Sequence, residues 1–180
     1  LLFETETTQG PKELCTKTFI EQSKKYKNYE KVLLIHWGEE NINYPLRSQR
    51  VKAKELINAG ADLIIGTHPH VIQGYEQYKN KYIFYSLGNF FFPDTNNKTG
   101  KIKRTKTNKT SIIPIFNNKL KLEKILTVYH ENNNKITLIK NNNKVKKLSK
   151  KLHFKYYQIL IVYELIKRDV IKPIIKKVIK

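Results

Sequence analysis

The sequence predicts an α/β fold in which a β-rich extension and a basic helical tail follow an α/β unit. Three observations predict it: two short apolar runs rich in branched residues, a segment with helical spacing between them, and later apolar segments joined by Asn-rich turns. Continuous apolar runs of this length are typical of strands buried on both faces. With 180 residues and 39% hydrophobic side chains, we expect one core but not two large ones.

The first elements are a helix and a βαβ unit. Pro11, at a favourable first helical position, predicts a helix that runs towards Tyr26. The two apolar runs are residues 31–36 and 62–66, and residues 45–59 between them have helical spacing. Connections this short give parallel strands, so we expect a site beyond their carboxyl ends.

The β-rich part follows the second strand. Residues 71–78 and 81–86 flank a Lys-Asn-Lys turn and predict an antiparallel hairpin, and residues 87–90 predict a loop at the same face as the expected site. Further strands are predicted at 111–116, 119–129 and 135–139.

The tail changes period. In residues 152–180 apolar side chains recur every three or four positions with Lys interspersed, which predicts a basic amphipathic helix that kinks or restarts at Pro173. Such a helix could dock onto the rest of the protein, or it could lie in a membrane interface with its Lys side chains towards anionic headgroups. The sequence leaves both interpretations open.

The net charge of +20 belongs to the second half of the chain. Up to Asp94 there are 12 basic and 11 acidic residues, and after it 23 basic and 4 acidic ones. This excess favours an anionic partner, although the A/T-rich codons of Lys and Asn explain it about as well. Lys outnumbers Arg 31 to 4, and the scarcity of the bidentate guanidinium disfavours nucleic acid.

Several protein classes are disfavoured by what the sequence lacks. Its one cysteine, Cys15, can form neither an internal disulfide framework nor a thiolate metal site. No run of 18 apolar residues and no signal-peptide pattern occur in it. Because it also has no methionine, we expect a fragment of a longer protein, with any export signal or anchor outside this sequence.

Three histidines stand at predicted strand ends. His36 ends the first strand, and His68 and His70 follow the second, on either side of Pro69. Imidazole nitrogen is a common ligand of Zn, Mn and Fe, and the His-x-His spacing lets two rings converge from one loop. We therefore predict a metal site with these three histidines as ligands, against the plainer interpretation of ordinary loop histidines.

The motifs around these histidines, in this order, resemble one known family. They are His36-Trp37-Gly38-Glu39-Glu40, Pro45, Gln49, Gly60-Ala61-Asp62, Gly66-Thr67-His68-Pro69-His70, Gln73, Glu76 and Tyr85-Ser86-Leu87-Gly88-Asn89-Phe90. Residues 11–94 resemble the CapA family of capsule and poly-γ-glutamate synthesis proteins, and residues 105–140 share only its general character. The resemblance implies an incomplete calcineurin-like metallophosphoesterase fold, a β-sandwich flanked by helices with a metal centre at one edge. By this resemblance, residues 1–140 are the C-terminal part of that domain, and residues 141–180 are a basic linker and amphipathic helix.

The resemblance also assigns the site. His36 is similar to the lone histidine ligand of the fourth superfamily motif, and His68 and His70 to the pair in the last. Four further residues match family positions and are candidates for contacts with the ligands or the substrate: Glu40, Gln49, Glu76 and Asn89. Plainer interpretations are a solvated carboxylate for Glu40 and a turn residue for Asn89. The family's earlier half supplies the remaining ligands, so a two-metal centre cannot be completed from this chain.

The function implied by the resemblance is synthesis or attachment of an anionic capsule or poly-γ-glutamate-type polymer, on a membrane-associated protein of the cell envelope. The implied cofactor is Mn, Fe or Zn, as one ion or two, and the implied partners are the anionic polymer and other capsule-synthesis proteins. If the whole protein is an enzyme, we expect metal-dependent hydrolysis or transfer. The alternative is a non-catalytic accessory whose basic half binds a polyanion or a membrane and whose histidines are relics.

Overall fold

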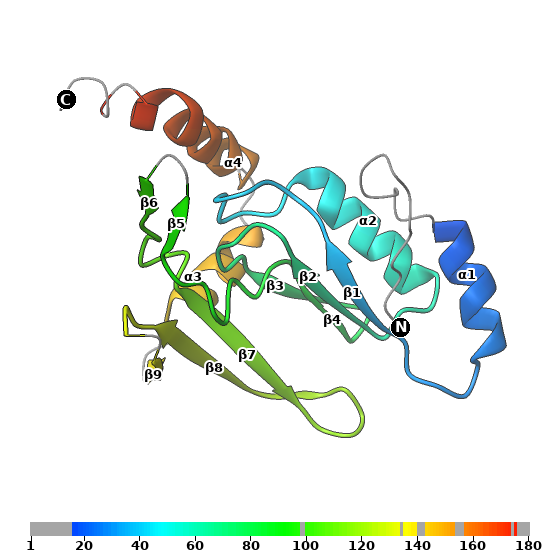
Figure 1. The fold of residues 1–180 in the computed structure, drawn as a ribbon. Helices are drawn as coiled ribbons and strands as arrows, with labels where there is room; N and C mark the ends of the chain where they lie inside the picture. Colours follow the sequence, from blue (N-terminus) through cyan, green and yellow to red (C-terminus); the bar gives the residue numbers. More distant parts are fainter. Residues whose placement is uncertain are drawn as a thin grey trace.

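The structure is a computed structural model that describes residues 16–97, 100–133, 135–139, 143–153, 157–173 and 175. The predicted helix start at Pro11 and the lone Cys15 lie outside the described residues. Within them the chain is a mixed α/β protein, as predicted (Figure 1). The elements in chain order are α1 (Thr16–Lys25), β1 (Val32–His36), α2 (Arg47–Asn58), β2 (Leu63–Thr67), β3 (Tyr75–Tyr78), β4 (Lys81–Phe84), β5 (Thr95–Asn97), β6 (Gly100–Ile102), β7 (Thr110–Phe116), β8 (Leu122–His130), β9 (Ile136–Ile139), α3 (Asn143–Leu152), α4 (Tyr157–Ile166) and the π-helical turn η1 (Lys167–Ile171).

The first sheet is mixed, with the order β1-β2-β4-β3. Strands β1, β2 and β4 are parallel, and β3 returns antiparallel beside β4, which confirms the predicted βαβ unit and hairpin. The register pairs His36 with Thr67, so both strands end at the same edge. Helix α2 begins where the backbone N–H of Leu46 donates to Oε1 of Gln49 at 2.8 Å, half of a capping box.

The first sheet lies between a helical layer and a second sheet (Figure 1). One of its faces packs Leu33 and Ile64 against Leu56 of α2. On its other face, Phe84 joins a core with Ile112 of β7, which also includes residues of α3 and α4. Burial of both faces explains the continuous apolar composition of β2, whereas β1, expected to be buried on both faces, exposes Leu34 on one of them.

The second sheet is the antiparallel meander β7-β8-β9, close to the predicted strand positions. It is joined to the first sheet next to the expected site, because the N–H of Ile112 donates to the carbonyl of Leu87 at 2.9 Å. The hairpin β5–β6 was not predicted, since its Asn-, Lys- and Thr-rich sequence has no apolar alternation.

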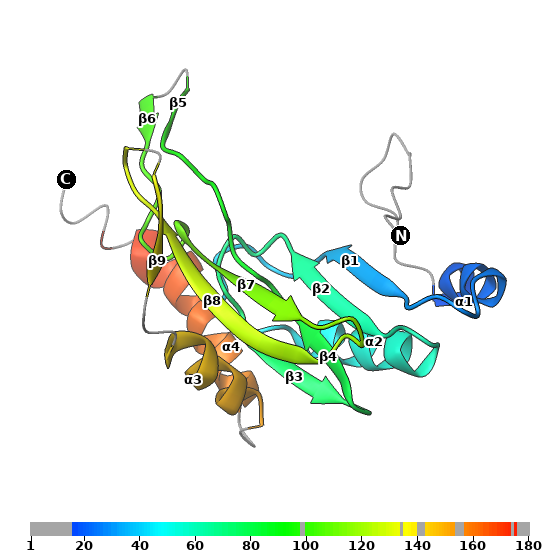
Figure 2. The same cartoon turned by 90° about the horizontal axis from the view of Figure 1, so that it is seen from below.

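The two edges of the first sheet differ. At the β3 edge, the N–H of Tyr75 donates to Oγ of Ser149 in α3 at 3.0 Å, so a helix covers this edge (Figure 2). Gly74 makes the close approach possible, because a Cβ there would lie 2.9 Å from the Ser149 nitrogen. At the β1 edge, no strand among the described residues pairs with the outer side of β1.

The predicted tail helix is present from Tyr157, as helix α4 and the π-helical turn η1 before Pro173, and α3, which ends at Leu152, is an additional helix where a linker was predicted. Of the predicted apolar stripe, Leu152 is buried at the end of α3, whereas Ile159, Tyr163 and Ile166 are exposed. A second apolar stripe packs against the body, so α4 is apolar on both sides, and the basic residues concentrate in α3 and after Ile166. No helix among the described residues combines the length and the apolar content that crossing a bilayer requires.

Candidate metal centre

The ends of β1 and β2 bring the three predicted histidines together. The ring centroids of His36 and His68 are 4.4 Å apart, and those of His68 and His70 are 6.0 Å apart. This proximity follows from the parallel register, which puts His36 beside Thr67 and therefore next to His68. The sequence thus located this edge of the sheet correctly.

The loop that carries the two later histidines has an unusual backbone. His68 and His70 both have positive φ angles, 93° and 56°, a region that costs energy for residues with a Cβ. The N–H of Asn41 donates to the carbonyl of Pro69 at 2.8 Å and joins this loop to the loop after β1. Strained backbone of this kind is common where the position of a functional side chain, rather than the stability of the fold, determines the backbone conformation.

A possible set of metal ligands consists of Glu40, His68 and His70. One ligand atom from each lies within 4.8 Å of the others, whereas His36 is outside this group. Glu40 was expected to contact the ligands or the substrate, and the geometry makes it a candidate ligand itself. Nδ1 of the exposed His36 lies 3.4 Å from Oγ1 of Thr67.

Asn89 orients His70. Its Nδ2 donates to the carbonyls of His70 and Asn108 at 3.0 and 2.9 Å, so its Oδ1 faces Nδ1 of His70 at 2.8 Å. An amide oxygen can only accept, and therefore a neutral His70 carries its proton on Nδ1 and keeps the Nε2 lone pair free for a ligand. Asn89 thus has the position of a residue that fixes a ligand's tautomer.

Asn108 completes the support and was not anticipated from the sequence. Its Nδ2 donates to Oδ1 of Asn41 at 2.8 Å and to the carbonyl of His70 at 3.1 Å. It therefore links the loop that carries Glu40, and the loop that carries His68 and His70, to the start of the second sheet. No motif marks it, because it lies in an Asn- and Lys-rich segment where asparagine is common.

An aromatic wall stands beside His70. The Phe92 ring stacks on it at 5.1 Å with an interplanar angle of 6°, and the Arg104 guanidinium lies 4.0 Å from the Phe92 ring centroid. Neither residue was anticipated from the sequence. Phe92 thus covers one face of a candidate ligand, and the Arg104 guanidinium lies against Phe92.

The electrostatics favour a neutral imidazole at His36. The pKa of His36 is lowered, first by partial burial and then by the nearby His68 and His70. His36 therefore stays uncharged to lower pH than a free histidine, which is the form that binds a metal.

Gln49 and Glu76 lie outside the histidine cluster. The Gln49 amide packs under Gly38, whose φ is +87°, so closely that a Cβ there would lie 2.6 Å from Nε2. Gln49 thus supports the loop that leads to Glu40. Glu76 is buried, accepts hydrogen bonds from Arg50, at 2.7 Å for Nη2, and from Tyr85, and so belongs to a separate network.

The tail contacts the loop that carries Glu40. Nη1 of Arg168, in η1, lies 3.2 Å from Oε2 of Glu39 and donates to the Glu40 carbonyl at 3.1 Å. The same guanidinium pairs with Asp169, at 2.5 Å from Nε to Oδ1. This link between residues far apart in the sequence could not be anticipated from it.

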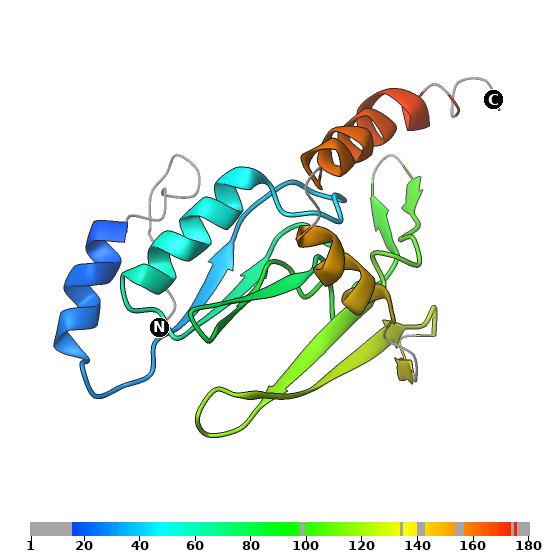
Figure 3. The ribbon, with the colours of Figure 1, turned by 180° about the vertical axis from the view of Figure 1, so that it is seen from behind.

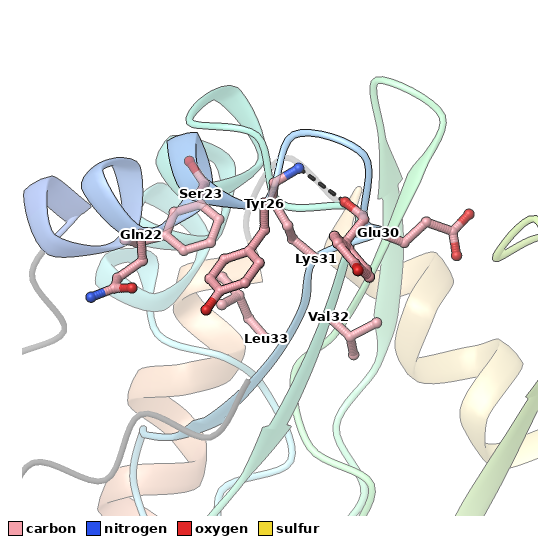
Figure 4. Close-up of a pocket in the computed structure, with 9 residues that line it drawn as sticks. Gln22, Ser23, Tyr26, Glu30, Lys31, Val32 and Leu33 are labelled. Atoms are coloured by element: carbon pink, nitrogen blue, oxygen red, sulfur yellow. Dashed lines mark hydrogen bonds between the residues drawn. The ribbon is translucent and has the colours of Figure 1, made fainter.

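A hollow of about 360 Å³ lies at the opposite end of β1 from the histidines (Figure 4). It is lined by α1, the connecting segment and the start of β1, with Phe19, Tyr26 and Leu33 among its walls. Its lining is mostly apolar, and it contains none of the candidate ligands.

The donor set fits a transition-metal ion. Two imidazole nitrogens and one carboxylate hold zinc in hydrolytic enzymes, and iron or manganese accept the same types of ligand. Glu40, His68 and His70 would hold the ion, with His36 beside them. Mg and Ca, which prefer oxygen ligands, fit this set less well.

Comparisons with known proteins identify the family to which the matched part of the chain is related. The family described as "Bacterial capsule synthesis protein PGA_cap" matches residues 5–94, half of the chain. "Capsule biosynthesis protein CapA" of Bacillus anthracis is 54% identical over 61 residues, which cover 34% of this chain and 15% of that protein. "PGA biosynthesis protein CapA" of Bacillus subtilis (strain 168) is 39% identical over 89 residues, 48% of this chain and 23% of that protein. The chain therefore spans less than a quarter of the length of these curated relatives, and it belongs to the bacterial capsule synthesis protein PGA_cap family.

Proposed function

We propose that this chain supplies part of the divalent-metal centre of a longer CapA-type protein, which makes or attaches a poly-γ-glutamate-type capsule polymer. The observation that carries the proposal is the convergence of ligand atoms of Glu40, His68 and His70 within 4.8 Å. The family relation to proteins of capsule and PGA biosynthesis supports the substrate class.

The finer fold assignment is a metallophosphoesterase-type sandwich. Two packed sheets flanked by helices, and histidines at the carboxyl ends of parallel strands, support it. A bound ion would supply Lewis-acid catalysis for hydrolysis or transfer. The chain's own residues would hold the ion, fix the His70 tautomer through Asn89 and shield one side of His70 with Phe92.

The proposed setting is the cell envelope, with the anionic polymer and other capsule-synthesis proteins as partners. The excess of positive charge after Asp94 supports contact with a polyanion, because it raises the local concentration of such a substrate.

The test is metal content measured by elemental analysis after dialysis against Mn, Fe or Zn and removal of free ions. We expect near-stoichiometric metal in the 180-residue chain and its loss in His68→Ala/His70→Ala. His153→Ala is the matched control, because this exposed histidine follows α3 and is outside the cluster.

A second pair of variants distinguishes a carboxylate that binds the metal from a neighbouring carboxylate that does not. Glu40→Gln removes a candidate ligand, whereas Glu39→Gln removes a carboxylate that pairs with Arg168. We expect metal affinity to fall at least about tenfold for Glu40→Gln and to change little for Glu39→Gln. Equal metal content in the chain and in the double histidine variant would overturn the proposal.

The accessory alternative makes the opposite prediction. If the histidines are relics, the chain holds no metal above the level of the double histidine variant. Its basic half would then bind poly-γ-glutamate with an affinity that falls steeply with salt and does not depend on His68 or His70.

A further inference from the structure

Helix α4 has two apolar faces with different environments. Tyr157 and Ile161 on its inner face are 8% and 6% exposed and belong to the core. The outer face of α4 consists of Ile159, Val162, Tyr163 and Ile166, which are 63%, 53%, 55% and 47% exposed. These positions follow the spacing of one side of a helix, so their side chains form one continuous apolar stripe.

The body holds α4 so that this stripe faces outwards. Before the helix, Nη1 of Arg50 donates to the Leu152 carbonyl at 3.0 Å, and its guanidinium lies 4.7 Å from the Tyr157 ring centroid. After the helix, Arg168 binds Glu39. Figure 3 shows α4, in orange to red, projecting beyond the sheets and α2. The stripe is thus displayed on an anchored helix.

The charges around the stripe are mainly positive. Lys167 lies 5.7 Å from the Tyr163 ring centroid, and Lys172 is exposed. The stripe therefore has cations beside it, and of the two carboxylates of α4 and η1, Asp169 is paired with Arg168 and Glu164 is half-buried.

A cationic hollow adjoins the start of α4. It has a volume of about 400 Å³ and is lined by Lys150, Lys151 and His153 together with Leu160. Leu160 lies between the inner and outer faces of α4, so the hollow borders the stripe. An apolar stripe next to a cationic hollow is complementary to acyl chains beneath anionic headgroups.

We propose that the outer face of α4 docks in the plane of an anionic membrane surface. The stripe enters the boundary between headgroups and acyl chains, and the cationic hollow receives lipid phosphate. The adjacent cations select a bilayer over a protein partner, because a protein surface would need matching carboxylates around an apolar centre. This proposal does not rest on the metal centre.

The test is sedimentation of the 180-residue chain with vesicles of phosphatidylcholine and phosphatidylglycerol, compared with phosphatidylcholine alone. We expect binding to the anionic vesicles and a loss of at least about tenfold in partitioning for Ile159→Ser/Ile166→Ser. Lys150→Gln/Lys151→Gln should weaken binding several-fold, mainly at low salt. The matched control is Val51→Ser/Leu138→Ser, which removes two equally exposed apolar side chains from α2 and β9.

A direct readout guards against misfolded variants. A tryptophan introduced by Tyr163→Trp should be quenched by vesicles with brominated acyl chains, whereas one introduced by Leu138→Trp should not. The proposal is overturned if the parent chain does not sediment with anionic vesicles, or if the stripe variant binds as the parent does. It is also overturned if the parent self-associates through the stripe and binds no vesicle, which would make the face an interface between copies.

Discussion

Two carboxylates at family-matched positions, Glu76 and Glu40, differ in what surrounds them. The Glu76 side chain is 4% exposed, and its oxygens accept hydrogen bonds from Arg50 and Tyr85. Glu40 is exposed and faces two imidazoles across a gap of ligand size. A carboxylate whose oxygens already accept hydrogen bonds from the protein stabilises the fold. A carboxylate that faces imidazole nitrogens is available to bind a cation together with them.

The largest expected effect is on the Glu76 network. Glu76→Ala leaves the Arg50 guanidinium half-buried and unpaired, so we expect a loss of about 3–5 kcal/mol in the free energy of unfolding. Urea unfolding followed by Trp37 fluorescence measures it, because Trp37 stacks on Tyr85. Glu55→Ala, which breaks an exposed pair with Lys52, is the control and should cost under about 1 kcal/mol. Similar losses in both variants would contradict the structural role of Glu76.

The same carboxylate should make stability depend on pH. Burial alone would raise the pKa of Glu76, but hydrogen bonds from Arg50 and Tyr85 outweigh it and hold the pKa below its ordinary value. A lowered pKa adds stability above the unfolded-state value, and this is lost as pH falls through the folded-state value. Urea midpoints of the parent chain should therefore drop as pH falls below about 4.5, more steeply than those of Glu76→Gln. If the urea midpoints of the parent chain and of Glu76→Gln fell equally with pH, the prediction would be wrong.

Asn89 should matter more to the metal than to the fold. Asn89→Ala removes the hydrogen bond that fixes the tautomer of His70, so we expect metal affinity to fall about 10–100-fold. The free energy of unfolding should fall by only about 1 kcal/mol. Asn117→Ala is the matched control, since Oδ1 of Asn117 accepts hydrogen bonds only in the β7–β8 turn. Titration calorimetry with Zn or Mn measures both variants, and equal affinities would remove Asn89 from the centre.

The smallest expected effect is a gain in stability rather than a loss. His68 has a φ of 93°, so His68→Gly should relieve strain and raise the unfolding free energy of the metal-free chain by about 0.5 kcal/mol. His68→Ala keeps the strained backbone and should show no gain. A gain in both variants would mean that the imidazole, rather than the backbone, is the source of strain.

The sequence predicted the elements that local patterns determine. The apolar runs of β1 and β2, the helical spacing of α2 and the turn between β3 and β4 all appear close to their predicted positions. The same reasoning located His36, His68 and His70 at one sheet edge, because parallel strands end together.

Long-range contacts could not be predicted in this way. Asn108 and Arg104 reach the site through the arrangement of the second sheet, and Arg168 reaches it from the far end of the chain. The tail helix was predicted to have one apolar stripe, but α4 has two, one packed against the body and one exposed. Periodicity finds faces but does not say which of them the body covers.

The contact of Arg168 with Glu39 and the Glu40 carbonyl has a thermodynamic consequence. It joins the end of α4 to the loop that carries a candidate ligand, so a displacement of the helix would change the position of that ligand. Equilibrium linkage is reciprocal: any factor by which docking of α4 changes affinity for the ion must equal the factor by which the ion changes docking. If the chain binds an ion at Glu40 and docks through α4, as proposed, Arg168 is the contact through which each event would change the other.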